Sequence, residues 1–245
     1  MRQEKLEIPM PGGSAEAFLI HDGAAKPGVL FLTDIMGIRE ANLGMAERVA
    51  EHGYTVLVPN AFWRASKLPV FDFPPQMGEE RTMKRFGELR AGLGNAQMGP
   101  DGAAYVDFLF KQKQVAGTKV GVVGYCFTGQ MALRIAAEVP DKIAAAASFH
   151  GGYLCTDAED SPHKLLPKVT ARLYFGHAIE DRTMPADQIV KFEAALKAWS
   201  GRHESETYEG ALHGWTVPGR AGIYNEKQAE RHYVKVFETF DAGFR

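Results

Sequence analysis

Cys126 is the residue in this sequence best placed to act as a nucleophile. It ends the β-rich run Lys119–Tyr125 and precedes the helical segment Met131–Glu138. A nucleophile on a sharp strand-to-helix turn projects above the sheet, and small neighbours such as Gly124 are needed because the turn is strained. The helix dipole favours a thiolate, and the N–H of Phe127 is placed to receive an oxyanion. A buried structural cysteine is the alternative.

Asp181 and His213 complete a set of acyl-transfer residues. Each follows a predicted strand, and catalytic groups collect at the carboxyl ends of strands in open α/β sheets. Their order after Cys126, acid and then histidine, is the order in which an α/β-hydrolase supplies a catalytic triad. Asp181 also fits a helix cap, its neighbour Glu180 is a rival acid, and His213 also fits a hydrogen-bonded loop histidine.

The elements that must position these residues are predicted from hydrophobic pattern. Short apolar runs alternate with segments of helical period, which indicates an α/β fold with a mostly parallel sheet and helices on both faces. The predicted strands are Gly28–Thr33, Tyr54–Val58, Lys119–Gly124, Ile143–Phe149, Ala171–Phe175 and Glu204–Tyr208. Beside the segment after Cys126, helices are predicted around Leu43, Ala46 and Ala50, around Ile189, Phe192, Leu196 and Trp199, and around Tyr233, Phe237 and Phe240.

Composition limits the classes of partner. A chain of 245 residues, 45% hydrophobic and 24% charged, suits one domain over residues 1–245. A formal net charge of -2 indicates a small-molecule partner, with no nucleic acid and no membrane surface. The absence of an apolar leader, together with two cysteines in no spaced framework, predicts a reducing, cytoplasmic location. No zinc-ligand spacing occurs, so we expect no metal and no cofactor.

One segment does not fit the alternating pattern. Residues 60–78 carry aromatic rings and prolines without a sustained period, and long loops of this kind often cover a site. We predict a lid or pocket wall; the alternatives are a groove-filling loop and packing against a second subunit. Phe62, Trp63, Phe127 and Trp215 are the predicted pocket rings.

Taken together, these residues resemble the dienelactone hydrolases, or carboxymethylenebutenolidases, which are α/β-hydrolases with a cysteine nucleophile. The resemblance extends from about Phe18 to Phe240. It rests on the segments Thr33–Gly37, Val58–Arg64, Gly124–Cys126, Asp181 before Met184-Pro185, and Gly210–Trp215.

The resemblance implies a role for each residue of the site. Cys126 would attack the carbonyl, His213 would transfer the proton and Asp181 would orient His213. The backbone N–H groups of Ile35 and Phe127 would form the oxyanion hole.

Three positions depart from the family. Asp34 stands where a glutamate helps to activate the cysteine, and we expect this shorter aspartate to activate Cys126 through a looser contact. Thr128 replaces a glycine and is expected to shift the turn slightly. Val217 stands where the family has an arginine that binds a substrate carboxylate. This difference argues against dienelactone as the substrate. The basic residues that remain as candidates for an anion contact are Arg81, Lys84, Arg85 and Arg220.

The predicted function is hydrolysis of a small ester or lactone through a thioester on Cys126, by a monomer or homodimer. One alternative is a cysteine-dependent amidase, which the separation of Asp181 and His213 along the chain disfavours. The other is a non-enzymatic binding or regulatory protein on a hydrolase fold.

Overall fold

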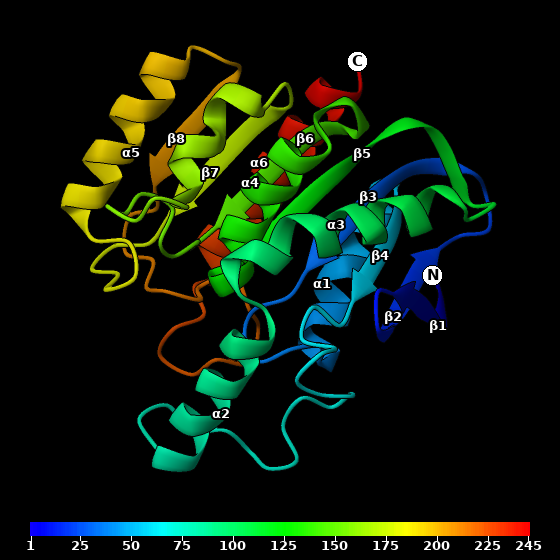
Figure 1. Ribbon diagram of the computed structural model, residues 1–245, viewed down its shortest axis with the longest axis horizontal. Helices are drawn as coiled ribbons and strands as arrows, with labels where there is room; N and C mark the ends of the chain where they lie inside the picture. Colours follow the sequence, from blue (N-terminus) through cyan, green and yellow to red (C-terminus); the bar gives the residue numbers. More distant parts are fainter.

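The fold is built on one eight-stranded sheet, seen in a computed structural model that describes all residues, 1–245 (Figure 1). The strand order is β1-β2-β4-β3-β5-β6-β7-β8; the β1–β2 and β2–β4 pairs are antiparallel, and every other pair is parallel. The strands are β1 Arg2–Met10, β2 Gly13–His21, β3 Lys26–Leu32, β4 Thr55–Pro59, β5 Val115–Tyr125, β6 Ile143–Phe149, β7 Arg172–His177 and β8 His203–Thr207.

Helices cover both faces of this sheet. On one face, α1 (Glu40–Glu51) and α6 (Glu226–Phe244) enclose a hydrophobic core. On the other, α3 (Asn95–Phe110), α4 (Gly129–Glu138) and α5 (Ala186–Trp199) enclose a second core. Helix α2 (Glu80–Gly92) stands away from the sheet at the lower end of the molecule in Figure 1. None of the helices combines the length and the apolar character needed to cross a membrane.

All six predicted strands are present, with ends that differ by a few residues. The helices predicted from the patterns near Leu43, Met131, Phe192 and Tyr233 are present as α1, α4, α5 and α6. Strands β1 and β2 were not predicted. Much of β1 is exposed at the edge of the sheet, so it lacks the apolar run by which the parallel strands were recognised.

Helix α3 was also not predicted, because Gly99, Pro100 and Gly102 lie within it and these residue types disfavour helix interiors. Close packing between α3 and α4 explains the glycine at position 102. A Cβ atom at this position would lie 2.0 Å from Cγ1 of Ile135 in α4, so only glycine allows the two helices to approach this closely.

Candidate active site

Cys126 lies on a strained turn between β5 and α4. Its φ angle is +58°, in the left-handed region, and it begins the short 3-10 helix Cys126–Thr128. Glycines flank the turn because there is no room for side chains. A Cβ atom on Gly124 would lie 2.3 Å from the Thr128 carbonyl oxygen, and one on Gly129 would lie 2.6 Å from Cα of Gly151. The turn therefore holds the thiol at the carboxyl end of the central strand.

The Thr128 side chain is held firmly within the turn. It is fully buried, and its hydroxyl lies 3.0, 2.9 and 3.0 Å from the carbonyl oxygens of Leu32, Thr33 and Tyr125. The same hydroxyl accepts a hydrogen bond from the Tyr125 N–H at 3.1 Å. The side chain that was expected to shift the turn instead ties the end of β3 to the turn after β5.

The imidazole of His213 bridges Cys126 and Asp181. Its Nε2 atom lies 3.0 Å from Sγ of Cys126, and its Nδ1 atom lies 2.6 Å from Oδ2 of Asp181. The other carboxylate oxygen of Asp181 accepts hydrogen bonds from the N–H and the hydroxyl of Thr183, at 2.8 and 2.7 Å. Glu180, the rival acid, is exposed. These contacts have the geometry of a nucleophile, a base and a residue that orients the base.

Electrostatics favour a charged His213. Burial alone would lower its pKa, but the neighbouring Cys126 sulfur and the Asp181 carboxylate outweigh burial and raise the pKa to about 10. Burial works in the opposite sense on Asp181, yet its hydrogen bonds from His213 and Thr183 keep its pKa below the usual value. The resting arrangement that these shifts favour is an imidazolium at His213 beside the Asp181 carboxylate.

A second histidine, His150, packs behind this imidazole, with ring centroids 5.1 Å apart. Burial and the nearby charge of His213 hold the pKa of His150 well below its ordinary value. One of its ring nitrogens, Nε2, is hydrogen-bonded to the Thr216 hydroxyl at 2.9 Å. His150 is thus a neutral, structural ring and does not compete with His213 for the proton.

Ile35 and Phe127 both line the cavity at Cys126, where the predicted oxyanion hole requires them. The Ile35 N–H donates to no protein acceptor. The Phe127 N–H belongs to the first turn of the 3-10 helix, where amides lack partners within the helix. Two backbone N–H groups are therefore free to donate hydrogen bonds beside Cys126.

The expected contact between Asp34 and Cys126 is not formed. Both carboxylate oxygens of Asp34 accept from Arg39, at 2.8 and 2.6 Å, and Oδ1 also accepts from the Met36 N–H at 2.9 Å. The Asp34 side chain is therefore held within its own loop, by contacts with two residues that follow Ile35. Asp34 thus shapes the loop that carries Ile35.

The cavity at Cys126 is small, about 60 Å³. Besides Ile35, Cys126, Phe127 and His213 it is lined by Arg90, Gly152, Tyr153 and Thr183. Arg90 was not among the predicted site residues, because it lies on α2, a helix missing from the predicted elements. Tyr153 and Thr183 follow β6 and β7. Their positions just after predicted strands could have identified them as residues of the site.

The other predicted pocket rings lie elsewhere. Phe62 and Trp215 are fully buried in the two cores; Phe62 stacks beneath Phe127 at 6.3 Å between centroids. Trp63 donates from its indole N–H to Asp101 at 3.2 Å. Of the four aromatic residues, only Phe127 lines the cavity at Cys126.

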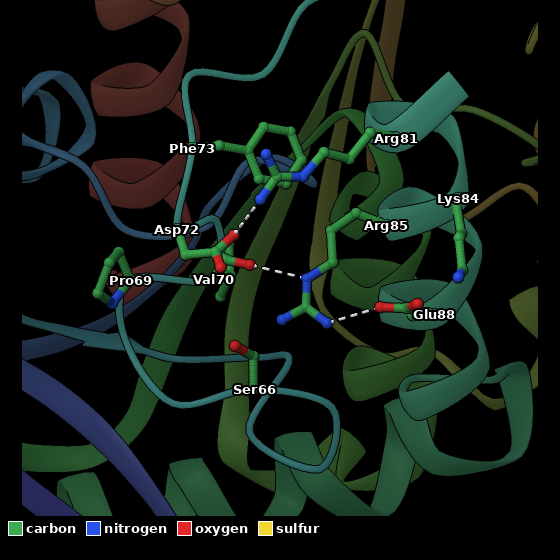
Figure 2. Close-up of a pocket in the computed structure, with 9 residues that line it drawn as sticks. All are labelled: Ser66, Pro69, Val70, Asp72, Phe73, Arg81, Lys84, Arg85 and Glu88. Atoms are coloured by element: carbon green, nitrogen blue, oxygen red, sulfur yellow. Dashed lines mark hydrogen bonds and ion pairs between the residues drawn. The ribbon is translucent and has the colours of Figure 1, made fainter. Parts of the chain in front are cut away.

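The predicted anion contacts are also placed outside this cavity. Arg220 packs against Gly214, where an added Cβ would lie 1.9 Å from its guanidinium, and Val217 is buried in the core. Arg81, Lys84 and Arg85 line a separate cavity of about 440 Å³ between α2 and the loop of residues 60–78 (Figure 2). The loop is therefore the wall of that cavity and forms no lid over Cys126.

Comparisons with known proteins identify the family and the fold. Residues 15–244 match the model of the family described as the dienelactone hydrolase family. A Synechocystis protein named "Putative carboxymethylenebutenolidase" is 27% identical over 224 residues, which cover 89% of this chain and 87% of the relative. "Hydrolase tropI" of Talaromyces stipitatus is 25% identical over 233 residues, covering 90% and 83%. A crystal structure titled "Putative Dienelactone Hydrolase", from Klebsiella pneumoniae, superposes with a TM-score of 0.84 at 20% identity over 98% of both chains.

Proposed function

The chain belongs to the dienelactone hydrolase family and is an ester or lactone hydrolase of the α/β-hydrolase fold, and we propose that Cys126 is its nucleophile, within a triad completed by His213 and Asp181. The observation that carries the proposal is the continuous set of contacts from Sγ of Cys126 through His213 to Asp181. A buried structural cysteine does not require an imidazole of raised pKa at hydrogen-bond distance.

Acylation begins with Cys126 as a thiolate and His213 as an imidazolium. The Cys126 thiolate attacks the ester carbonyl carbon and forms a C–S bond, while the N–H groups of Ile35 and Phe127 stabilise the oxyanion. As the C–O bond to the leaving group breaks, the His213 imidazolium donates its proton to the departing alkoxide. The products of this half-reaction are an alcohol and a thioester on Cys126.

Deacylation uses the same residues in the opposite sense. Neutral His213 now accepts a proton from a water molecule that attacks the thioester carbonyl. The C–S bond breaks, which releases the carboxylic acid and restores the thiolate beside the imidazolium. Asp181 keeps Nδ1 of His213 protonated through both steps, so that Nε2 always faces the reacting atoms.

Arg90 suggests an additional substrate preference. Arg90 is exposed, lines the cavity at Cys126 and forms none of the ion pairs of the protein. An unpaired guanidinium beside a reacting centre favours a substrate with a carboxylate near the scissile bond. In this proposal, Arg90 supplies the anion contact for which the candidates predicted from the sequence were Arg81, Lys84, Arg85 and Arg220.

Hydrolysis by matched proteins tests the nucleophile. The parent protein and the Cys126→Ala variant are compared on a p-nitrophenyl acetate series and on dienelactone. We expect turnover by the parent and none above background by the variant, whose fold is checked by circular dichroism. Undiminished turnover by Cys126→Ala would rule out the cysteine mechanism.

A second comparison tests Arg90. Arg90→Gln should lower kcat/KM for a carboxylate-bearing ester by about tenfold to a hundredfold more than for its neutral methyl ester, because a charged hydrogen bond contributes roughly 1.5–3 kcal/mol. Arg81→Gln, in the separate cavity, is the matched control and should affect both esters alike. An equal effect of Arg90→Gln on both esters would remove the anion contact.

A further inference from the structure

A second cavity adjoins the small cavity at Cys126. It has a volume of about 270 Å³, and Phe127 and Tyr153 line both cavities. Its remaining lining residues are Asn95, Gln130, Thr156, Ser161 and Pro162. We call it the distal cavity. Since the cavity at Cys126 measures only about 60 Å³ and small-molecule sites usually measure roughly 300–1,000 Å³, a substrate needs further space beside the reacting group.

Gln130 gives the distal cavity a polar group of defined orientation. It lies in the first turn of α4 and is only 3% exposed. Its Oε1 atom accepts from Nε of Arg134 at 3.4 Å, and Arg134 is fixed in turn by a bond of 2.7 Å to the Asp160 carbonyl oxygen. Because a guanidinium only donates, the amide oxygen must face Arg134, which leaves the amide NH2 group as the unengaged end of a side chain that lines the distal cavity.

The NH2 group of Gln130 is a donor without a partner in the protein. It forms no hydrogen bond, and it is not among the polar atoms sealed from solvent. The neighbouring Ser161 hydroxyl is already engaged, at 2.8 Å from both the Thr156 N–H and Nδ1 of His163. No ionised side chain lines the distal cavity. It therefore offers a hydrogen-bond donor in neutral surroundings.

We propose that the distal cavity binds a neutral part of the substrate that carries a hydrogen-bond acceptor, such as an ether, hydroxyl or carbonyl oxygen, through the NH2 group of Gln130. This inference rests on the proposed reaction at Cys126 and extends it to a substrate class. The substrate is an oxygenated ester that passes between Phe127 and Tyr153, and hydrocarbon esters of the same length bind less favourably in the transition state.

The test compares esters that differ by one atom. In acyl chains of p-nitrophenyl esters and in alkyl chains of acetate esters, an ether oxygen replaces one methylene at successive positions. The ratio of kcat/KM for each ether to that of its hydrocarbon parent is measured on the same protein, so a general loss of activity cancels. One neutral hydrogen bond should raise this ratio by about threefold to tenfold at the position that reaches Gln130.

Variants assign the effect to the amide. Gln130→Leu removes the amide and should lose the raised ratio. Gln130→Glu keeps the shape and the contact with Arg134 but places an oxygen where the NH2 group was, so its ratio should be equal to or lower than that of Gln130→Leu. Gln97→Glu, on the exposed side of α3, adds the same charge and should leave the ratio unchanged.

The outcomes separate this inference from the proposed mechanism. A raised ratio that is lost in both Gln130 variants supports the distal cavity. Hydrolysis through Cys126 with equal ratios in the parent and in both variants overturns the inference and leaves the mechanism intact. Hydrolysis that persists in Cys126→Ala refutes the mechanism, and with it the basis of this inference.

Discussion

At the residue scale, the site depends on one imidazole that contacts both a sulfur and a carboxylate. Asp181 contacts His213 at 2.6 Å, and Thr183 holds the carboxylate from its other side. Each side chain has a single geometric task.

Asp181→Asn preserves the size of the side chain but removes its charge and allows the wrong tautomer of His213. We expect kcat/KM for p-nitrophenyl acetate to fall on the order of 10²- to 10⁴-fold, as such a change does in other triads. Glu180→Gln, at the exposed neighbour, is the control and should retain near-parental turnover. Equal effects of the two substitutions would contradict the role of Asp181.

The protonation of His213 can be followed directly by NMR of its ring nitrogens. We expect a titration midpoint of about 10 in the parent protein. In Cys126→Ala the midpoint should be lower, because the interactions with sulfur that raise the pKa are lost. Folding raises the pKa of His213 above its ordinary value of 6.5. The charged imidazole therefore stabilises the fold fully below pH 6.5, and this contribution to stability is lost as the pH rises through about 10. A parental midpoint at or below 6.5 would contradict the ion pair.

At the scale of elements, the site depends on how the ends of β3 and β5 are joined. The Thr128 hydroxyl lies against the carbonyl groups of Leu32 and Thr33 at the end of β3, just before the loop that carries Ile35. It thereby couples the turn that carries Cys126 to the loop that carries Ile35.

Thr128→Val removes this hydroxyl at nearly constant volume and leaves buried backbone groups unpaired. The free energy of unfolding should fall by about 1–3 kcal/mol, measured by urea denaturation. Thr128→Ser keeps the hydroxyl and should lose less stability. If serine proved as destabilising as valine, packing of the methyl group rather than the hydrogen bonds would explain Thr128.

The elements predicted from sequence are those that bury a regular apolar pattern. The central strands and the helices with clear stripes, such as the one around Phe192, follow from periodicity. Strand β1 is too exposed to show such a pattern, and α3 contains the glycines and proline that normally exclude a helix. The positions of Cys126, Asp181 and His213 follow from strand ends, whereas Arg90 reaches the site only through the tertiary placement of α2.

Local contacts explain the remaining differences. The pairing of Asp34 with Arg39 depends on a loop conformation that residue types alone do not specify. The aromatic residues of the loop of residues 60–78 were expected at the site because aromatic loops often cover sites. Here Phe71 packs edge-on against Phe86 of α2, with centroids 5.7 Å apart, so the loop supports that helix.

At the scale of the whole molecule, one sheet runs from β1 to β8, and both cores pack on it. We predict that the chain unfolds as a single domain, in one cooperative transition. Differential scanning calorimetry should give a calorimetric enthalpy equal to the van't Hoff enthalpy. Two resolved transitions would instead indicate that a part, such as β1 and β2 at the sheet edge, unfolds separately.

The most direct test of the central claim is intact-protein mass spectrometry after rapid acid quenching of the reaction with p-nitrophenyl acetate. The account predicts a mass increase of one acetyl group that peptide mapping places on Cys126, that hydroxylamine removes, and that is absent in Cys126→Ala. Turnover by the parent with no adduct on Cys126, together with undiminished turnover by Cys126→Ala, would contradict it.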